Sequence, residues 1–425
     1  MAREYLKKTA VPFQKRRAEV EDTVRRMLAD IAENKDEAIA RYARDLDNWT
    51  GPFRVTAAEI DAKSRSLSKV FKEDFDLCHK NVTDFAKRQK ESIQAFEVEL
   101  YPGAVLGQRL IPIENVGCYI PGGKYPLISA AIMSVGTART AGVAHITGCA
   151  PPRGADGIYP QTLYALHKSG ADEIYCLGGA QALAAMAMGL VGMKKADLIT
   201  GPGNPYVAEA KRQLFGIAGI DLLAGPTEIL IIADETADPM MVATDLLGQA
   251  EHGPDSPAWL VTTSRKLGEA VIKEVERQLP DLPTRENAGR AWTDLGEVIV
   301  VSSDDEAIAV SDEYAPEHLE IQTGRDDYYL ERLTSYGSLF IGEASTVAYG
   351  DKGVGTNHTL PTGRSARYTG GLSVHKFTKI VTYERLTRRA SREIAPVISR
   401  VCREEGMIAH AITGEVRVKR YEGAN

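Results

Sequence analysis

Apolar and polar residues recur along this chain with the periods of helices and strands. The segments Glu19–Ala32 and Phe71–Phe96 carry apolar residues at helical spacing, which predicts that the N-terminal part of the chain is helical. The pair Gly51-Pro52 interrupts the pattern between these two segments. From about Glu99 onward the chain becomes rich in β-branched residues and glycine, a texture typical of strands and turns.

From Ala141 onward, short apolar runs alternate with helical runs. Buried strands are predicted at 144–150, 173–179, 196–203, 221–234, 257–264, 296–303 and 337–342. Helices are predicted between the earlier strands, at 161–170, 181–189 and 205–214. This rhythm is that of a parallel, doubly wound sheet. The sequence therefore predicts an α/β fold with two Rossmann-like parallel-sheet domains and helical segments at both ends, since the pattern after Gly371 is helical again.

Composition narrows the class of protein. A chain of 425 residues exceeds the usual single core, so we expect two or more domains. The 51 basic and 58 acidic residues give a net charge of −7, which argues against nucleic acid as a partner. No apolar run approaches the roughly 20 residues that span a bilayer, and the polar, basic start is not a secretory signal, so no membrane partner is expected. The five scattered cysteines favour free thiols and a cytoplasmic location.

Two glycine-rich turns are candidate ligand sites. Residues 178–182 (GGAQA) and 199–205 (ITGPGNP) each follow a predicted strand and open a predicted helix. Backbone amides at a helix N-terminus suit a phosphate or another anion. Neither turn has the GxGxxG pattern, so a tight turn that needs glycine for its geometry stays the alternative. Tyr119, Gln181 and Asn204 lie at the mouths of these turns, where ligands of open α/β sheets bind.

Two further segments combine histidine with amide or acidic side chains. Gln249 and His252 are three residues apart at the end of a helical run, so they share a face. A capped helix end is the alternative explanation, because Gln is an uncommon zinc ligand. Asp351 and His358 lie in a glycine-rich loop, where side chains can converge, although Asp351 could equally form an Asx turn. Considered together, the four side chains indicate a divalent metal site.

Glu317 and His318 are a candidate acid/base pair. Neighbouring residues of an extended segment face opposite sides, so the two can have separate roles, and His is well suited to take a proton near neutral pH. A surface acid beside a buried histidine is the alternative. Glu405 and His410 are five residues apart, which one regular helix would point in different directions, unless Gly406 breaks it. By itself, His410 is better explained as a surface or capping histidine.

Eight segments, in the same order as here, resemble the histidinol dehydrogenase family. They are VGCYIPGG, LGGAQALAA, GPGNPYVAEAKR, LAGPTEILIIAD, GQAEHG, YAPEHLE, GTNHTLPT and EGMIAH. The resemblance extends from about Val20 to Lys419 and identifies the chain as a member of that family. It implies an NAD-linked, zinc-dependent dehydrogenase that oxidises a primary alcohol, through a bound aldehyde, to the carboxylate.

The resemblance also implies the role of each matching residue. Glu317 and His318 match the catalytic pair. The residues that match the four protein ligands of one zinc ion per chain are Gln249, His252, Asp351 and His410. The residues that match the NAD contacts are Tyr119, Gln181 and Asn204. The residues that match the substrate contacts are Thr227, Gln249, His252, His318, Asp351, His358, Glu405 and His410.

The family implies a domain arrangement and a homodimer with shared active sites. Residues 1–17 are expected to form an N-terminal arm. Residues 18–118 and 234–371 are expected to form a discontinuous α/β catalytic domain, interrupted by an inserted NAD-binding Rossmann-like domain at 119–233. Residues 372–425 are expected to form a helical segment that crosses to the partner. Glu405 and His410 would then face the partner's site, so their unfavourable spacing on one helix would not prevent them from contributing to it.

Several segments look more similar to a branch of the family that oxidises sulfopropanediol (2,3-dihydroxypropane-1-sulfonate) to sulfolactate. His375 and Lys376 stand where biosynthetic members tend to carry acidic residues, and Lys124 lies near the first cofactor segment. Cations in place of acids favour an anionic substrate. Thr227 stands where Ser is usual, and Leu127 where that branch is expected to be polar. Histidinol itself and a related polyol or hydroxy acid therefore stay open as alternative substrates.

Overall fold

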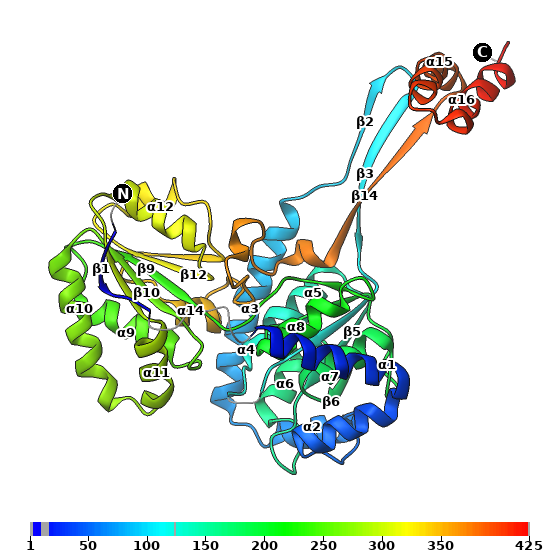
Figure 1. Cartoon of the computed structure of the whole chain (residues 1–425). Helices are drawn as coiled ribbons and strands as arrows, with labels where there is room; N and C mark the ends of the chain where they lie inside the picture. The colour runs from blue at the N-terminus through cyan, green and yellow to red at the C-terminus, as the bar shows by residue number, and fades with distance from the viewer. Residues whose placement is uncertain (1–2, 10–16, 123–124, 424–425) are drawn as a thin grey trace. The chain divides into compact units, whose positions relative to one another are not determined.

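The computed structural model describes residues 3–9, 17–122 and 125–423, in two compact units (Figure 1). The first unit consists of Met1–Arg88 and Ile113–Phe377, and the second consists of Gln89–Pro112 and Thr378–Asn425. The first unit contains both of the parallel sheets that the sequence predicts, and the second contains a small antiparallel sheet. Each unit is described separately.

A six-stranded sheet in the first unit has the order β1-β11-β10-β9-β12-β13. Its strands are β1 (Glu4–Lys7), β9 (Ile229–Ala233), β10 (Ala258–Thr262), β11 (Glu297–Val300), β12 (His318–Gln322) and β13 (Ser338–Ile341). All of the neighbouring pairs are parallel except β1 with β11, which is antiparallel. The apolar run that the sequence shows at β9 is explained by this place between β10 and β12, because strands covered on both faces are apolar throughout.

Helices cover both faces of this sheet. Ile229 and Ile231 of β9 pack in one core, and Leu230 and Ile232 pack in the other, as the alternation of a strand requires. The helices of the first core are α9 (Pro239–Ala250), α10 (Arg265–Gln278) and α11 (Arg285–Leu295). The helices of the second core are α12 (Asp304–Tyr314) and α13 (Asp326–Leu330). After β13, the chain continues through α14 (Val347–Lys352), η3 (Ser365–Arg367) and η4 (Val374–Phe377).

A five-stranded, fully parallel sheet has the order β6-β5-β4-β7-β8. Its strands are β4 (Asn115–Tyr119), β5 (His145–Ala150), β6 (Glu173–Cys176), β7 (Leu198–Thr200) and β8 (Gly219–Ile220). One face packs against α1 (Arg17–Asp47), α7 (Gly179–Met188) and α8 (Pro205–Leu214). The other face packs against α2 (Ala57–Arg65), α3 (Lys69–Glu91), α4 (Ser129–Ala131), η1 (Ile132–Gly136), α5 (Thr137–Ala141) and α6 (Pro160–Lys168).

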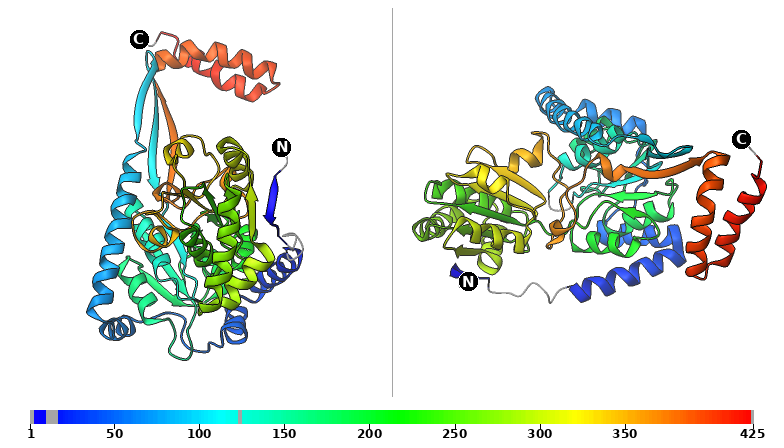
Figure 2. Two further views of the ribbon diagram at one scale, coloured as in Figure 1. Left: turned by 90° about the vertical axis from the view of Figure 1, so that its left-hand side faces the viewer. Right: turned by 90° about the horizontal axis from the view of Figure 1, so that it is seen from above.

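The second unit contains three antiparallel strands and two helices. The strands β2 (Phe96–Tyr101), β3 (Ala104–Pro112) and β14 (Thr378–Leu386) pair in the order β14-β3-β2. Helices α15 (Arg388–Glu404) and α16 (Ile408–Arg420) pack against each other beyond the strands (Figure 2). Gly406 has a φ of 73° and lies between the two helices, so Glu405 and His410 do not share one continuous helix.

The predicted fold class is confirmed, with local differences. The buried strand β12 was not among the predicted strands. β1 lies in the predicted N-terminal arm, β14 lies in a segment that was predicted to be helical, and α3 ends at Glu91 rather than at Phe96. All five cysteines are free, and Cys118, Cys149 and Cys176 are buried. In the part of the chain that is described, no helix has the length and apolar character to cross a membrane. The predicted domain limits stay a prediction; in the structure β9 belongs to the six-stranded sheet, and α1 to α3 pack beside the five-stranded sheet.

Candidate functional site

A pocket of about 770 Å³ in the first unit contains most of the predicted site residues. Its volume is within the range of small-molecule and cofactor sites. Part of its lining lies at the carboxyl ends of β4, β6 and β7, where open parallel sheets bind ligands. The predicted residues in the lining are Tyr119, Gln181, Asn204, Thr227, His252, Glu317, His318, Asp351 and His358. Gln249 is connected to them by hydrogen bonds, whereas Glu405 and His410 belong to the second unit, so their part in the site stays a prediction.

Glu317 lies directly before β12 and is held by the segment that leads into β9. Its Oε2 atom accepts hydrogen bonds from the Thr227 hydroxyl and from the backbone N–H of Glu228, the latter at 3.1 Å. The residue is 5% exposed. Burial raises the pKa of Glu317 to about 7, although the charge of His318 and the bond from Thr227 oppose this. Glu317 is therefore a carboxyl group that can change its protonation near neutral pH.

His318 is the first residue of β12 and is 2% exposed. Its Nδ1 atom lies 3.4 Å from Glu317 Oε2, 3.2 Å from Gln249 Nε2 and 3.2 Å from the Glu228 carbonyl oxygen. Its Nε2 atom has no hydrogen-bond partner, and Asp351 Oδ1 lies 3.5 Å away. Burial favours the neutral ring, but the two carboxylates outweigh it and raise the pKa of His318 to about 9. Glu317 and His318 both line the pocket because Glu317 precedes the strand, where strand alternation does not apply.

The imidazoles of His252 and His358 lie in the same pocket near Asp351. Burial lowers the pKa of His252, and it lowers the pKa of His358 to about 4, although the charge of Asp351 opposes both shifts. The Nε2 atom of His358 is 3.2 Å from the Ser129 hydroxyl. Burial opposes ionisation of Asp351, but its contact with His318 holds the Asp351 pKa well below the usual range. Neutral imidazoles beside a carboxylate are the protonation states that bind a metal ion.

The predicted metal ligands stay a prediction. Among the described residues, no group of three or more His, Cys, Asp and Glu side chains is spaced to hold a metal ion. Within the first unit the predicted set contributes two such side chains, His252 and Asp351, and the amide of Gln249. Its fourth member, His410, is an exposed residue of α16 in the second unit.

The two glycine-rich turns open helices, as the sequence predicted. Gly178 precedes α7, and Asn204 caps α8 with its Oδ1 atom, which accepts from the N–H groups of Tyr206 and Val207 at 3.0 Å each. The Tyr119 hydroxyl accepts from Gly179 N–H at 3.2 Å. All three predicted NAD residues line the pocket.

Several pocket residues could not be recognised from the sequence. Asp47, at the end of α1, accepts hydrogen bonds from Gly178 N–H at 3.2 Å and from Gln181 Nε2 at 3.0 Å. Lys352 lines the pocket next to Asp351, whereas His375 and Lys376 are not among the described residues that line it. Lys376 instead donates to the Thr369 hydroxyl at 3.1 Å. Lys124 lies outside the described residues.

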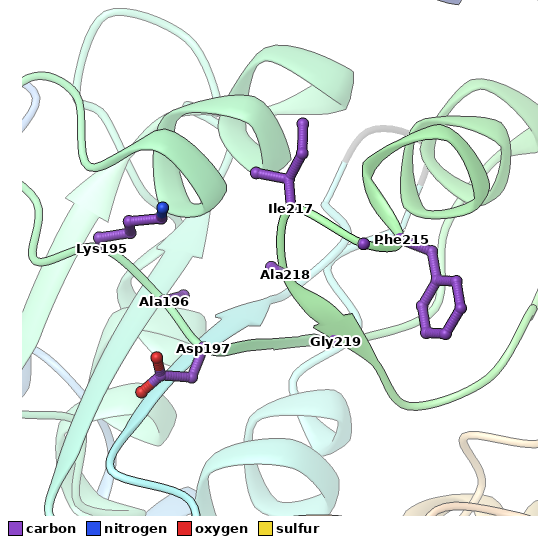
Figure 3. A pocket seen from close by; sticks show the side chains of 8 residues that line it. Lys195, Ala196, Asp197, Phe215, Ile217, Ala218 and Gly219 are labelled. Carbon is purple, nitrogen blue, oxygen red and sulfur yellow. The ribbon is translucent and has the colours of Figure 1, made fainter. Parts of the chain in front are cut away.

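A smaller hollow of about 360 Å³ lies at the amino ends of β7 and β8 (Figure 3). Its one carboxylate, Asp197, accepts hydrogen bonds from the backbone and side chain of Asn115 at 3.1 and 3.2 Å. This carboxylate therefore stabilises the sheet. The hollow is also at the opposite ends of the strands from the pocket described above, so it is not the candidate site.

Comparison with known proteins identifies the family. The histidinol dehydrogenase family model matches residues 12–418. The chain is 48% identical to the sulfopropanediol 3-dehydrogenase of Ruegeria pomeroyi, over 99% of this chain and 97% of that protein. It is 39% identical to the histidinol dehydrogenase of Thermus thermophilus, over 94% of each chain. The crystal structure of histidinol dehydrogenase from Elizabethkingia anophelis has a TM-score of 0.90 at 37% identity, covering 97% of this chain and 94% of that one. The chain belongs to the histidinol dehydrogenase family, as its motifs predicted.

Proposed function

We propose that this protein is a zinc-dependent, NAD-linked dehydrogenase that oxidises a primary alcohol, through a bound aldehyde, to the carboxylate. The observation that carries the proposal is the meeting of Glu317, His318 and Asp351 in one pocket with the glycine-rich turns that open α7 and α8. Acid/base groups and a cofactor-sized cavity are the two requirements of such a reaction.

The donor set of the pocket fits a zinc ion. Gln249 and Asp351 offer oxygens and His252 offers a neutral nitrogen, and we propose His410 of a partner chain as the fourth ligand. The unpartnered Nε2 atom of His318 beside Asp351 supports a polar ligand at this position. Bound zinc would fix the substrate and polarise its oxygen, since zinc has no redox chemistry.

Tyr119, Gln181 and Asn204 are the proposed contacts of NAD. The Oε1 atom of Gln181 supports this, because it is buried without a hydrogen-bond partner in a side chain that is 1% exposed. An acceptor in that condition is stabilised by a ligand that donates to it. Bound NAD would accept hydride, while the protein supplies position and charge. We propose the five-stranded sheet with α7 and α8 as the cofactor domain.

We propose separate roles for the two members of the catalytic pair. In its neutral form, His318 takes the hydroxyl proton of the alcohol at Nε2, an atom that has no hydrogen-bond partner among the described residues. A cation held by Asp351 would weaken the support that this carboxylate gives to an imidazolium at His318, and would so lower the pKa of His318, although the charge of Glu317 would remain. Glu317 activates the water that hydrates the aldehyde, and Thr227 orients Glu317 through its hydroxyl.

The proposed substrate is (R)-sulfopropanediol, with sulfolactate as product. The support is the 48% identity to a sulfopropanediol 3-dehydrogenase, together with the family branch that the sequence resembles. The charges of the pocket support an anionic substrate less. The described lining contains one lysine, Lys352, and four carboxyl groups, those of Asp47, Asp255, Glu317 and Asp351. Histidinol is the second candidate, because a relative at 39% identity is a histidinol dehydrogenase. We propose as substrate contacts Thr227, Gln249, His252, His318, Asp351, His358, Glu405 and His410.

A homodimer with shared sites is proposed on the surface of the second unit. Helices α15 and α16 expose apolar side chains there, namely Val397, Ile398, Val401, Ile408, Ile412 and Val416. A cluster of exposed apolar side chains marks an interaction surface. A second copy that covers it would also supply His410 and Glu405. The five free thiols support a cytoplasmic location.

A substrate panel tests the proposed activity. Purified protein loaded with zinc is mixed with NAD and either enantiomer of sulfopropanediol, or with histidinol, and NADH absorbance is followed. The proposal predicts the highest kcat/KM for (R)-sulfopropanediol. A clearly higher kcat/KM for histidinol, or growth of a histidine auxotroph supplied with this gene, would favour the second candidate. Absence of NADH with every alcohol would overturn both.

A further inference from the structure

The end of the pocket at α7 is built from hydrogen-bond acceptors. Asp47 Oδ2 accepts from Gly178 N–H at 3.2 Å and from Gln181 Nε2 at 3.0 Å, while no described residue donates to Asp47 Oδ1. The α7 N-cap, Gly178, has no side chain of its own to cap the helix. A helix N-terminus is ordinarily an anion site, but here a carboxylate of the protein already occupies it.

A second acceptor at the same place has no partner. Gln181 Oε1 is buried and makes no hydrogen bond, and it lies so close to Gly179 that a Cβ there would approach it to 2.6 Å. Its Nε2 atom is already committed to Asp47, so the amide is oriented with its acceptor free. Because a buried acceptor without a partner is destabilising, this atom indicates a ligand that donates hydrogen bonds.

The charges around the α7 end of the pocket exclude a phosphate group as its ligand. The described pocket lining contains a single basic residue with a permanent charge, Lys352, which follows Asp351 at the catalytic end. No described cation in the lining neighbours Asp47, since its hydrogen-bond partners are Gly178 and Gln181. A phosphate dianion here would meet a carboxylate without compensation, whereas a pair of hydroxyl groups could donate to Asp47 and to Gln181.

Resting on the proposed function, we infer that Asp47 and Gln181 bind the vicinal hydroxyls of the adenosine ribose of NAD, and that Asp47 excludes NADP. The nicotinamide must reach His318 for hydride transfer, so the adenosine half is the one left for the carboxyl end of β6, where Asp47 and Gln181 lie. The 2′-phosphate of NADP would replace a hydroxyl donor with a charge of the same sign as Asp47. In other dinucleotide folds a carboxylate on the ribose has this discriminating effect.

Calorimetric titration of the zinc-loaded protein with NAD and with NADP tests this inference without measuring turnover. The variant is Asp47→Asn, which keeps an oxygen acceptor for Gly178 and removes the charge. The matched control is Asp45→Asn, an identical change at an exposed residue of the same helix end, where Asp45 pairs with Arg44. We expect the wild-type protein and Asp45→Asn to prefer NAD at least tenfold, and Asp47→Asn to lose a factor of about 10 to 100 in that preference.

The outcomes are distinguishable. An unchanged preference in a folded Asp47→Asn protein would overturn the inference and leave Asp47 as a cap of α7. Equal binding of NAD and NADP by the wild type would overturn it as well, with the proposed function intact. Binding of neither cofactor would overturn the proposed function and this inference together.

A measurement on the wild type covers the case in which Asp47→Asn does not fold. ADP-ribose and its 2′-phosphate are titrated at low and high salt. The inference predicts that ADP-ribose binds more tightly than its 2′-phosphate at low salt. The difference between the two affinities should become smaller at high salt, because screening weakens the repulsion between Asp47 and the 2′-phosphate. Equal affinities at low salt would overturn it.

Discussion

Replacing Glu320 by glutamine should make the stability of the protein less dependent on pH. Glu320 lies in β12, two residues after His318 and on the same face, and it is 0% exposed. Gln322 donates its Nε2 atom to Glu320 Oε1 at 2.8 Å and to Asp245 Oδ2 at 3.1 Å. Asp245, on α9, also accepts from the Thr346 hydroxyl at 3.0 Å. Two carboxyl groups therefore meet inside the first core, between α9 and β12.

The direction of the effect follows from the raised pKa of Glu320. Burial, followed by the charge of Asp245, raises the pKa of Glu320 from 4.5 to about 9. Because the folded protein holds a proton that the unfolded chain has released, the stabilisation is fully present below about pH 4.5 and is lost as pH rises through about 9. Between these values the free energy of unfolding falls by at most about 1.4 kcal/mol for each pH unit.

Glutamine keeps the shape of Glu320 and carries no charge at any pH. Urea denaturation of the wild type and of Glu320→Gln, at pH 6 and pH 8, measures the difference. The variant should gain up to about 3 kcal/mol relative to the wild type over this interval. Glu276→Gln is the same change at an exposed residue of α10, and its free energy of unfolding should change with pH as that of the wild type does. If Glu320→Gln showed the same dependence on pH as the wild type, a raised pKa of Glu320 would be refuted.

Three further predictions concern the site. Elemental analysis of the wild type should find about one zinc ion per chain, and His252→Ala should lose most of it. The control His167→Ala, at an exposed position of α6, should keep its zinc. Full activity of a metal-free preparation would contradict the role of zinc. In steady-state assays with each substrate, Glu317→Gln should slow oxidation of the aldehyde more than oxidation of the alcohol, because only oxidation of the aldehyde needs activated water. Equal loss of both rates would show that Glu317 does not activate the water. A mixture of the inactive His318→Ala and His410→Ala proteins should recover about a quarter of wild-type activity if subunits exchange at random. The reason is that half of the dimers are then mixed, and each mixed dimer holds one intact site of two. No recovery, with exchange confirmed, would place His410 in the site of its own chain.

The sequence predicted the parallel sheets well because their strands are covered on both faces. Runs such as the one ending in β9 are apolar throughout and stand out from the helices that follow them. The sequence missed β12, a buried strand that was not among the predicted ones, and it also missed two strands that are short or exposed. β1 is an edge strand of four residues, and the strand β14 carries exposed and partly exposed side chains along its length, so neither has a clear apolar face.

The candidate site was predicted where one short segment carries two informative residues, as at Glu317 and His318. Asp47 was not predicted, because it reaches the α7 N-terminus from a helix more than a hundred residues earlier in the chain, and a lone Asp at a helix end has many explanations. The part that His375 and Lys376 have at the substrate stays a prediction. The described lining of the pocket contains Lys352, and Lys376 donates to the Thr369 hydroxyl.

The central claim is that one site oxidises an alcohol twice, with His318 and Glu317 in successive roles. Its most direct test is the ratio of NADH formed to alcohol consumed, measured by absorbance and by mass spectrometry of the product under limiting substrate. Retention of the aldehyde in the buried pocket predicts a ratio of about two and a carboxylate product from the first turnovers onward. A ratio of about one, with free aldehyde in solution, would contradict the account.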